Sequence, residues 1–185
     1  MYAAAISLFI EKGFDSTTME DIAERADVAR ATVFNHFPRK AAFIDEWTAR
    51  RSERAAVAVR IDDLEGAPLR SVLKRYFTAM CEISQANAAS RRETVALMNA
   101  AVHSTNLLTR SDLSQEVSRF VSHARKAGEV DAKADPDLIG MLVVSAYLTV
   151  LITWINEEPA PFVLSEKVAT TIDLLLKGVL TASSG

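Results

Sequence analysis

Two short helical segments separated by only three residues constrain this chain more than any other feature of its sequence. Residues 18–26 and 30–36 each carry a helical pattern, and Pro38 prevents the second from continuing because proline has no backbone N–H to donate. A turn this tight makes the two helices cross closely, and the small side chain of Ala23 permits the approach. The spacing predicts a helix-turn-helix.

The first of these helices is preceded by a capping signal. Thr17 is followed three residues later by Glu20, the spacing at which a hydroxyl and a carboxylate satisfy each other's backbone N–H groups. We therefore expect the helix to begin at Thr18. An apolar stripe over residues 1–12 predicts an earlier helix that ends at Gly13.

Positive charge is local to the second helical segment. The chain has a net charge of -3, yet no acidic residue occurs from Val28 to Ile44. Val33 and Phe37 are expected to pack inward. The side chains left outside are polar or cationic: Arg30, Thr32, Asn35 and His36. A helix of this kind fits the major groove of DNA, where such side chains contact base edges and phosphates.

Two further contacts with phosphate are expected beside this helix. Thr17 and Thr18 lie at a helix N-terminus, where N–H groups and the helix dipole attract anions, and Lys40 provides a cation after Pro38. The same pattern also fits a solvated surface, because paired helices with tight turns occur in proteins that do not bind DNA. Spacing and charge alone leave both readings open.

The segment AAAISLFIEKGFDSTTMEDIAERADVARATVFNHFPRKAAF, residues 3–43, resembles the N-terminal domain of TetR-family (tetracycline-repressor-like) regulators. The shared frame consists of the pair Gly13-Phe14, then Thr18, Ile22 and Ala23, and then the run Thr32-Val33-Phe34-x-His36-Phe37-x-x-Lys40. The resemblance implies DNA contacts from nine residues: Thr17, Thr18, Arg30, Ala31, Thr32, Phe34, Asn35, His36 and Lys40.

Three positions depart from the family pattern. Phe34 stands where tyrosine is usual, so a hydroxyl bond to the DNA backbone is lost. Ala29 replaces a capping serine, at a cost of about 1 kcal/mol, and Asp27 replaces a turn glycine whose left-handed conformation aspartate tolerates less well. Family members often carry a basic arm before the first helix, and whether one precedes residue 1 stays open.

The remainder of the sequence predicts an all-α body. Helical patterns occupy six further ranges, namely 40–60, 68–87, 91–104, 111–127, 135–156 and 162–180. The stretch IDDLEGAP, residues 61–68, is the clearest break. We expect about nine helices in two domains: a three-helix DNA-binding domain over residues 1–45, and a larger ligand-binding and dimerisation domain over residues 46–185.

The run from Leu138 to Ile155 has no charged residue and is nearly long enough to span a bilayer. Acidic residues flank it on both sides and no lysine or arginine sets an orientation, so a buried helix is expected and no membrane. The resemblance implies a homodimer through the last two helices. One face of the final helix is expected to supply the interface: Leu164, Val168, Ile172, Leu175 and Val179.

An effector pocket in the body is implied by the same resemblance. Apolar residues with a few polar groups suit such a pocket, and the candidates are Phe77, Met80, Cys81, Met98, His103, Phe120 and Tyr147. Ordinary core packing is the favoured explanation for any one of them. The sequence does not specify the effector.

No enzyme motif, metal site or cofactor site is found in the sequence. Cys81, the single cysteine, cannot form an internal disulfide, which favours the cytoplasm. We therefore expect a ligand-responsive transcriptional regulator, in the first place a repressor, that binds a palindromic operator as a homodimer and is released by a small molecule. The alternative is a helical ligand-binding or scaffold protein whose DNA-binding head has lost its function.

Overall fold

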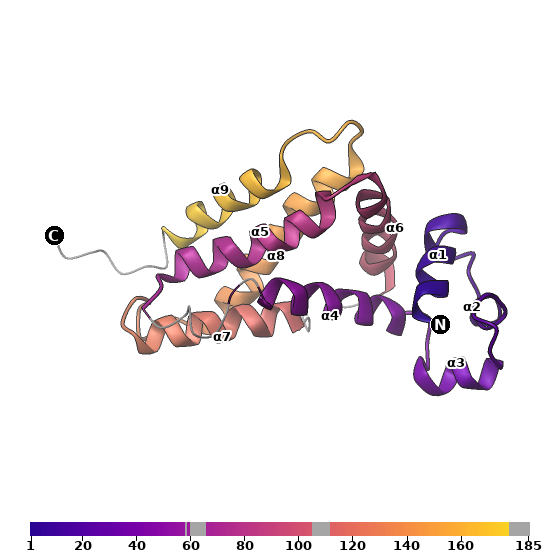
Figure 1. Cartoon of the computed structure of the whole chain (residues 1–185). Coiled ribbons are helices and arrows are strands. Elements are labelled where there is room, and N and C mark those ends of the chain that lie inside the picture. The colour runs from indigo at the N-terminus through magenta and orange to yellow at the C-terminus, as the bar shows by residue number, and fades with distance from the viewer. Residues whose placement is uncertain (58, 60–65, 105–111, 178–185) are drawn as a thin grey trace. The chain divides into compact units, whose positions relative to one another are not determined.

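The structure is a computed structural model that describes residues 1–57, 59, 66–104 and 112–177 (Figure 1). Within these residues the chain forms nine α-helices and no strand, which confirms the all-α expectation. The helices are α1 (Tyr2–Lys12), α2 (Met19–Arg25), α3 (Arg30–His36), α4 (Ala42–Val57), α5 (Leu69–Gln85), α6 (Ala88–Ser104), α7 (Asp112–Lys126), α8 (Pro136–Asn156) and α9 (Leu164–Leu176).

The chain divides into two compact units, and the division differs from the expected one at residue 45. Unit 1 contains residues 1–50 and the segment from Ser84 that includes α6, whereas unit 2 contains 51–83 and the chain from α7 onward. α6 belongs with the head because it packs against α1. The indole N–H of Trp47 on α4 also donates to Glu93 on α6, at 2.8 Å.

The head of unit 1, which comprises α1 to α3 and the start of α4, is built around an aromatic core. Phe9 and Phe43 are buried with ring centroids 6.2 Å apart, and Phe37 stacks on Phe43 at 3.9 Å. Ile22 and Val33 are both fully buried, as the predicted inward face of the helix-turn-helix requires. These contacts fix α3 against α1 and α4.

The cap of α2 lies one residue later than the sequence predicted. Thr18, and not Thr17, is the N-cap: its hydroxyl accepts from the backbone N–H of Asp21 at 3.1 Å, and the Asp21 carboxylate accepts from the Thr18 N–H at 2.7 Å. The predicted pairing of Thr17 with Glu20 is wrong, because the Thr17 hydroxyl instead donates to the Gly13 carbonyl at 2.7 Å.

The turn between α2 and α3 contains two of the three departures from the family pattern. Asp27 adopts a φ of 52°, the left-handed conformation that a turn glycine would adopt more easily. Ala29 occupies the N-cap of α3 and provides no side-chain hydrogen bond. The turn and the helix therefore form, but without the side-chain cap that serine would add.

Unit 2 is held together by the packing of α7 on α8 and of α8 on α9. α7 and α8 approach closely at Gly140, where a Cβ atom would lie 2.5 Å from the Ser118 hydroxyl and 2.8 Å from the Ser114 carbonyl oxygen. α9 runs beside α5 (Figure 1), where Asp173 pairs with Lys74 at 2.9 Å and with Arg70 at 3.2 Å. The two cations lower the pKa of Asp173, and the hydrogen bond from Lys74 is the largest cause.

α8 is the one described helix that is long and apolar enough to cross a membrane. Half of its most apolar 18-residue stretch is buried inside the chain. Its inner face includes Val144, Leu151 and Trp154. Its outer face exposes Leu138, Met141 and Leu142. The helix is thus buried on one side by its own chain, while an apolar strip on the other side stays accessible.

The predicted dimer face of α9 points into unit 2. Leu164, Val168 and Ile172 are at most 2% exposed, so their side chains are packed inside their own chain and cannot contact a second subunit. Leu175 is half-buried, and Val179 lies outside the described residues. The prediction is wrong for the three buried residues, because periodicity shows that a helix has an apolar face without showing which neighbour covers it.

Candidate nucleic-acid interface and body cavity

α3 presents six of its seven residues away from the head core. Val33 is fully buried and holds the helix in place, while Thr32 and Phe34 are half-buried. The other four side chains are exposed: Arg30, Ala31, Asn35 and His36. Thr18 is also exposed, close to the start of α2. The positions predicted on the recognition helix are therefore all at least partly accessible, and we call this set of residues the α3 surface.

Arg30 is held in place by two neighbours. Its guanidinium lies 2.6 Å from the carboxylate of Glu20 on α2 and 5.2 Å from the centre of the Phe34 ring. Both members of the ion pair are more than half exposed, so water screens the attraction. Sequence reasoning named Arg30 but missed Glu20, because the acid lies on the preceding helix and outside the acid-free run.

Thr17 does not belong to the α3 surface. Its side chain is only 1% exposed, and its hydroxyl bonds to the backbone inside the head. A direct contact between this side chain and DNA is therefore ruled out in this conformation, which corrects the expectation. Both threonines lie next to the start of the helix in the sequence, and only the tertiary packing distinguishes them.

Lys40 makes a different set of contacts from the one expected. Its Nζ donates to the carbonyl oxygens of Phe14 at 2.5 Å, of Thr17 at 2.9 Å and of Asp15 at 3.2 Å. The ammonium also lies 4.4 Å from the centre of the Phe14 ring. The sequence suggested a cation directed at phosphate, whereas the structure directs it into the loop between α1 and α2.

Ion pairs join α1 to α2 behind the α3 surface. Arg25 donates to both carboxylate oxygens of Glu11, at 3.0 and 2.8 Å, and Lys12 lies 2.6 Å from Asp21. The Arg25 hydrogen bond, helped by Ser7, lowers the pKa of Glu11 to about 2. The hydrogen bond from Lys12, followed by those from Thr18, brings the pKa of Asp21 well below its usual range.

Three of the predicted pocket residues, Phe77, Phe120 and Tyr147, form an aromatic cluster with Tyr76, which was not among the predicted residues. Tyr76 contacts Phe77 and Phe120 with ring centroids 5.4 and 5.5 Å apart, and Phe77 contacts Tyr147 at 4.9 Å. Met80 and Cys81 are also buried. Burial raises the pKa of the Cys81 thiol to about 12 and raises that of the Tyr147 hydroxyl well above its ordinary value.

Two of the predicted pocket residues lie outside unit 2. Met98 is buried on α6 in unit 1, and the side chain of His103 lies outside the described part of the chain. The remaining five candidates lie in unit 2, and all five are buried there.

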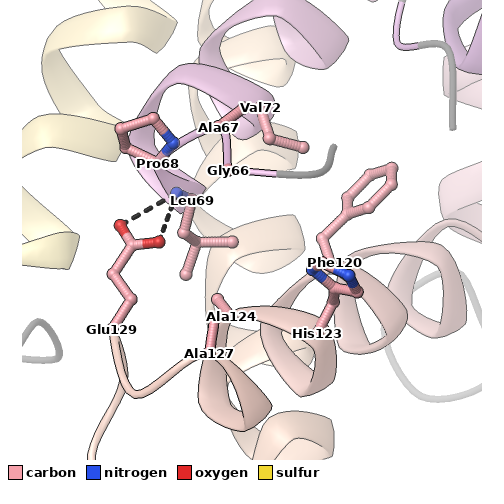
Figure 2. A pocket seen from close by; sticks show the side chains of 10 residues that line it. All are labelled: Gly66, Ala67, Pro68, Leu69, Val72, Phe120, His123, Ala124, Ala127 and Glu129. Carbon is pink, nitrogen blue, oxygen red and sulfur yellow. Dashed lines mark hydrogen bonds between the residues drawn. The ribbon is translucent and has the colours of Figure 1, made fainter. Parts of the chain in front are cut away.

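A cavity of about 400 Å³ opens at the N-terminal end of α5. Figure 2 shows Phe120 and His123 side by side on α7, facing the cavity from one side, with Leu69 and Glu129 at its other end. Apolar or small residues make up the rest of the lining: Gly66, Ala67, Pro68, Val72, Ala124 and Ala127. Of the predicted pocket residues that the structure describes, only Phe120 lines this cavity. The cavity forms where the N-terminal end of α5 lies near α7, an arrangement that the sequence does not specify.

No group of three or more potential metal ligands occurs among the residues that the structure describes. The candidate sites are therefore a cationic and polar helix surface in the head and an apolar cavity with two ionisable side chains at its edge.

Comparison with known proteins places the head in a family. Residues 2–47 match the model of "Bacterial regulatory proteins, tetR family". The HTH-type transcriptional repressor KstR of Rhodococcus jostii is 24% identical over 94% of this chain and 79% of its own length. The HTH-type regulator YdeS of Bacillus subtilis is 43% identical over a shorter region, which covers 30% of this chain and 28% of that protein.

Solved structures share the whole fold. The TetR-family repressor FadR of Thermus thermophilus, in complex with lauroyl-CoA, aligns with a TM-score of 0.73 at 21% identity, covering 99% of this chain and 95% of that one. SmeT, the repressor of a multidrug efflux pump of Stenotrophomonas maltophilia, aligns with a TM-score of 0.69 at 21% identity, over 98% and 89% of the two chains. Residues 2–47 therefore carry the TetR-family N-terminal domain, and the chain as a whole shares the all-helical fold of the solved TetR-family regulators.

Proposed function

We propose that this protein is a ligand-responsive transcriptional repressor that binds a near-palindromic operator as a homodimer in the cytoplasm. The observation that carries the proposal is the α3 surface. Val33 is fully buried, and Arg30, Asn35 and His36 on the same helix are exposed. This is the arrangement by which a recognition helix enters the major groove while its inner side stays packed on the head.

Base reading is assigned to the exposed polar residues of α3. Arg30 suits guanine, whose O6 and N7 accept two hydrogen bonds, and Asn35 suits adenine in the same way. Thr32, His36 and Thr18 provide further hydrogen-bonding groups, while Phe34 and Ala31 offer apolar contact to a thymine methyl group. Thr17 and Lys40 are left out of this contact set because their polar atoms bond inside the head.

Dimerisation is assigned to the exposed strip of α8 with the neighbouring exposed residues of α9. Five large apolar side chains are exposed on α8, on α9 and at the N-cap residue before α9: Leu138, Met141, Leu142, Leu174 and Val163. A second copy would remove this surface from water, which favours association. A two-fold dimer would also carry two recognition helices, and reading successive major grooves requires them to lie about 34–36 Å apart, one turn of DNA.

The effector site is assigned to the cavity between α5 and α7. Its apolar walls suit a small hydrophobic ligand, and His123 and Glu129 at its edge provide polar contacts. A ligand releases the protein from DNA only if it binds one conformation of the dimer better than the other. The lauroyl-CoA bound to the similar FadR structure makes acyl-CoA thioesters a reasonable first set of probes.

Selection from a random duplex DNA library tests the proposal. We expect the unmodified protein to enrich a near-palindrome, Asn35→Ala to lose sequence preference, and Arg30→Ala to weaken binding. Lys133→Ala is the matched control, since it removes an exposed cation of unit 2 and leaves binding unchanged. Enrichment of no sequence by the unmodified dimer would contradict the proposal and favour a helical ligand-binding protein with an inactive head.

Light scattering and thermal shift test the other two assignments. Leu142→Asp should give a monomer, whereas Val57→Asp, which alters an even more accessible apolar residue, on α4, should remain a dimer. A ligand of the folded state should raise the melting temperature. Ala127→Phe, at an exposed position lining the cavity, should abolish that rise.

A further inference from the structure

The contacts of Lys40 define a role that differs from binding DNA. A lysine ammonium has three N–H donors and no acceptor. In this structure the three nearest acceptors are the carbonyl oxygens of Phe14, Asp15 and Thr17. A phosphate oxygen could take one of these donors only if a carbonyl oxygen of the head lost it.

The position of these partners along the chain gives the contacts a mechanical meaning. Residues 14–17 lead directly into α2, and Lys40 follows α3 by four residues. The ammonium therefore joins the point where the chain enters the helix-turn-helix to the point where it leaves. Phe14 adds a second attachment, because its ring faces the same ammonium and also packs on the buried Phe9, with centroids 5.0 Å apart.

Other contacts show that this loop is part of the packed head. The Thr17 side chain is 1% exposed and bonds to the Gly13 carbonyl, and the Thr17 N–H donates to the Phe14 carbonyl at 3.2 Å. The loop thus directs three carbonyl oxygens at one cation. Without a cation there, those oxygens would face one another across the loop and repel.

We propose that Lys40 is a positioning residue, which holds α2 and α3 in their DNA-binding arrangement by clamping residues 14–17 to the start of α4, and that it does not bind phosphate. The inference rests on the proposed function for its effect on DNA, but the clamp itself is a property of the unbound chain. It makes Lys40 different in kind from Arg39, whose exposed guanidinium pairs with Asp45 at 2.7 Å.

Nuclear magnetic resonance reads the clamp directly in the intact 185-residue chain. With ¹⁵N and ¹³C labels, couplings across the hydrogen bonds should connect Lys40 Nζ to the carbonyl carbons of residues 14 and 17. They should persist when operator DNA is added. Absence of the couplings in the unbound protein, or their loss on DNA binding, would overturn the proposal.

Substitutions separate a clamp from a phosphate contact. Lys40→Arg keeps the charge, but a planar guanidinium cannot direct three donors at three converging carbonyls, so operator affinity should fall at least tenfold. The slope of log affinity against log salt should stay within about 0.3 of the unmodified value, because no phosphate contact is lost. The melting temperature should fall as well.

Arg39→Ala is the matched control, because it removes the same charge one residue earlier and leaves the loop contacts intact. Two results would show that Lys40 is a phosphate ligand and that the clamp is wrong. One is that Lys40→Arg binds the operator as tightly as the unmodified protein. The other is that Lys40→Ala lowers the salt slope by about 1 without a change in melting temperature. Failure of the unmodified protein to bind any DNA would contradict the proposed function instead, and the couplings in the unbound chain would still decide the clamp.

Discussion

Both carboxylate oxygens of Glu129 accept a hydrogen bond from the backbone N–H of Leu69, each at 2.8 Å, across 60 positions of sequence. Leu69 is the first residue of α5, where the backbone N–H groups have no partner within the helix. The loop after α7 therefore caps α5 from outside, and the same contact closes one end of the cavity (Figure 2).

Glu129→Ala should destabilise unit 2. The substitution removes a charged acceptor from a helix N-terminus and leaves a part-buried N–H without it, so the free energy of unfolding should fall by about 1–3 kcal/mol. Urea denaturation measures the change. Glu82→Ala, which alters an exposed acid of α5, should shift the midpoint far less; equal losses would show that the contact is not important.

Glu20→Gln should raise the affinity for non-specific DNA about two- to fivefold at low salt. The carboxylate competes with phosphate for the Arg30 guanidinium at 2.6 Å, and exposed pairs of this kind are worth only a modest free energy. Fluorescence anisotropy with a random duplex measures the gain. Glu24→Gln is the control, because it removes an exposed acid from the same helix; an equal gain there would mean that net charge alone is responsible.

Ala29→Ser should stabilise the head. Ala29 has an extended conformation at the N-cap of α3 and makes no side-chain cap, so a serine hydroxyl could accept from the first turn and add about 1 kcal/mol. Thermal and urea unfolding both report the gain. Ala31→Ser, inside the same helix, should be neutral or slightly unfavourable, and a gain from this control instead would refute the capping argument.

Lowering the pH should weaken the connection between α1 and α2. The pKa of Glu11 is about 2 in the folded chain against an ordinary value of 4.5. A depressed pKa contributes stability that is present above 4.5 and is lost as the pH falls toward 2. Glu11→Gln should therefore flatten the decline of unfolding free energy with pH in this window, measured by urea titrations at several pH values; an unchanged decline would contradict the ion pair's contribution.

Gly140→Ala should loosen the packing of α7 on α8. The added Cβ would lie 2.8 Å from a backbone oxygen of Ser114, and that oxygen cannot move without shifting its helix. We expect a loss of about 1–3 kcal/mol in unfolding free energy. Ser118→Ala should not restore it, because the backbone clash remains. Ser145→Ala, on the same helix, should have little effect; an unchanged melting temperature for Gly140→Ala would contradict the close approach.

Local signals in the sequence were sufficient for the helices and for the head. Gly13 ends α1, α3 covers the predicted residues 30–36, and Asp27 has the left-handed backbone that the replaced glycine implied. Such features depend on neighbours a few residues apart, and the chain carries that information locally. The capping box failed by one position because Thr17 and Thr18 are equivalent in sequence and differ only in what packs around them.

What the sequence by itself determined is therefore the all-helical class, the helix-turn-helix and the inward role of Val33. Only the tertiary structure decided which polar atoms remain available. It buried Thr17, directed Lys40 at three carbonyl oxygens and turned Leu164, Val168 and Ile172 toward their own chain. The physical reason is that the period of a helix fixes which residues share a face, whereas burial and hydrogen bonding depend on segments that meet only after folding.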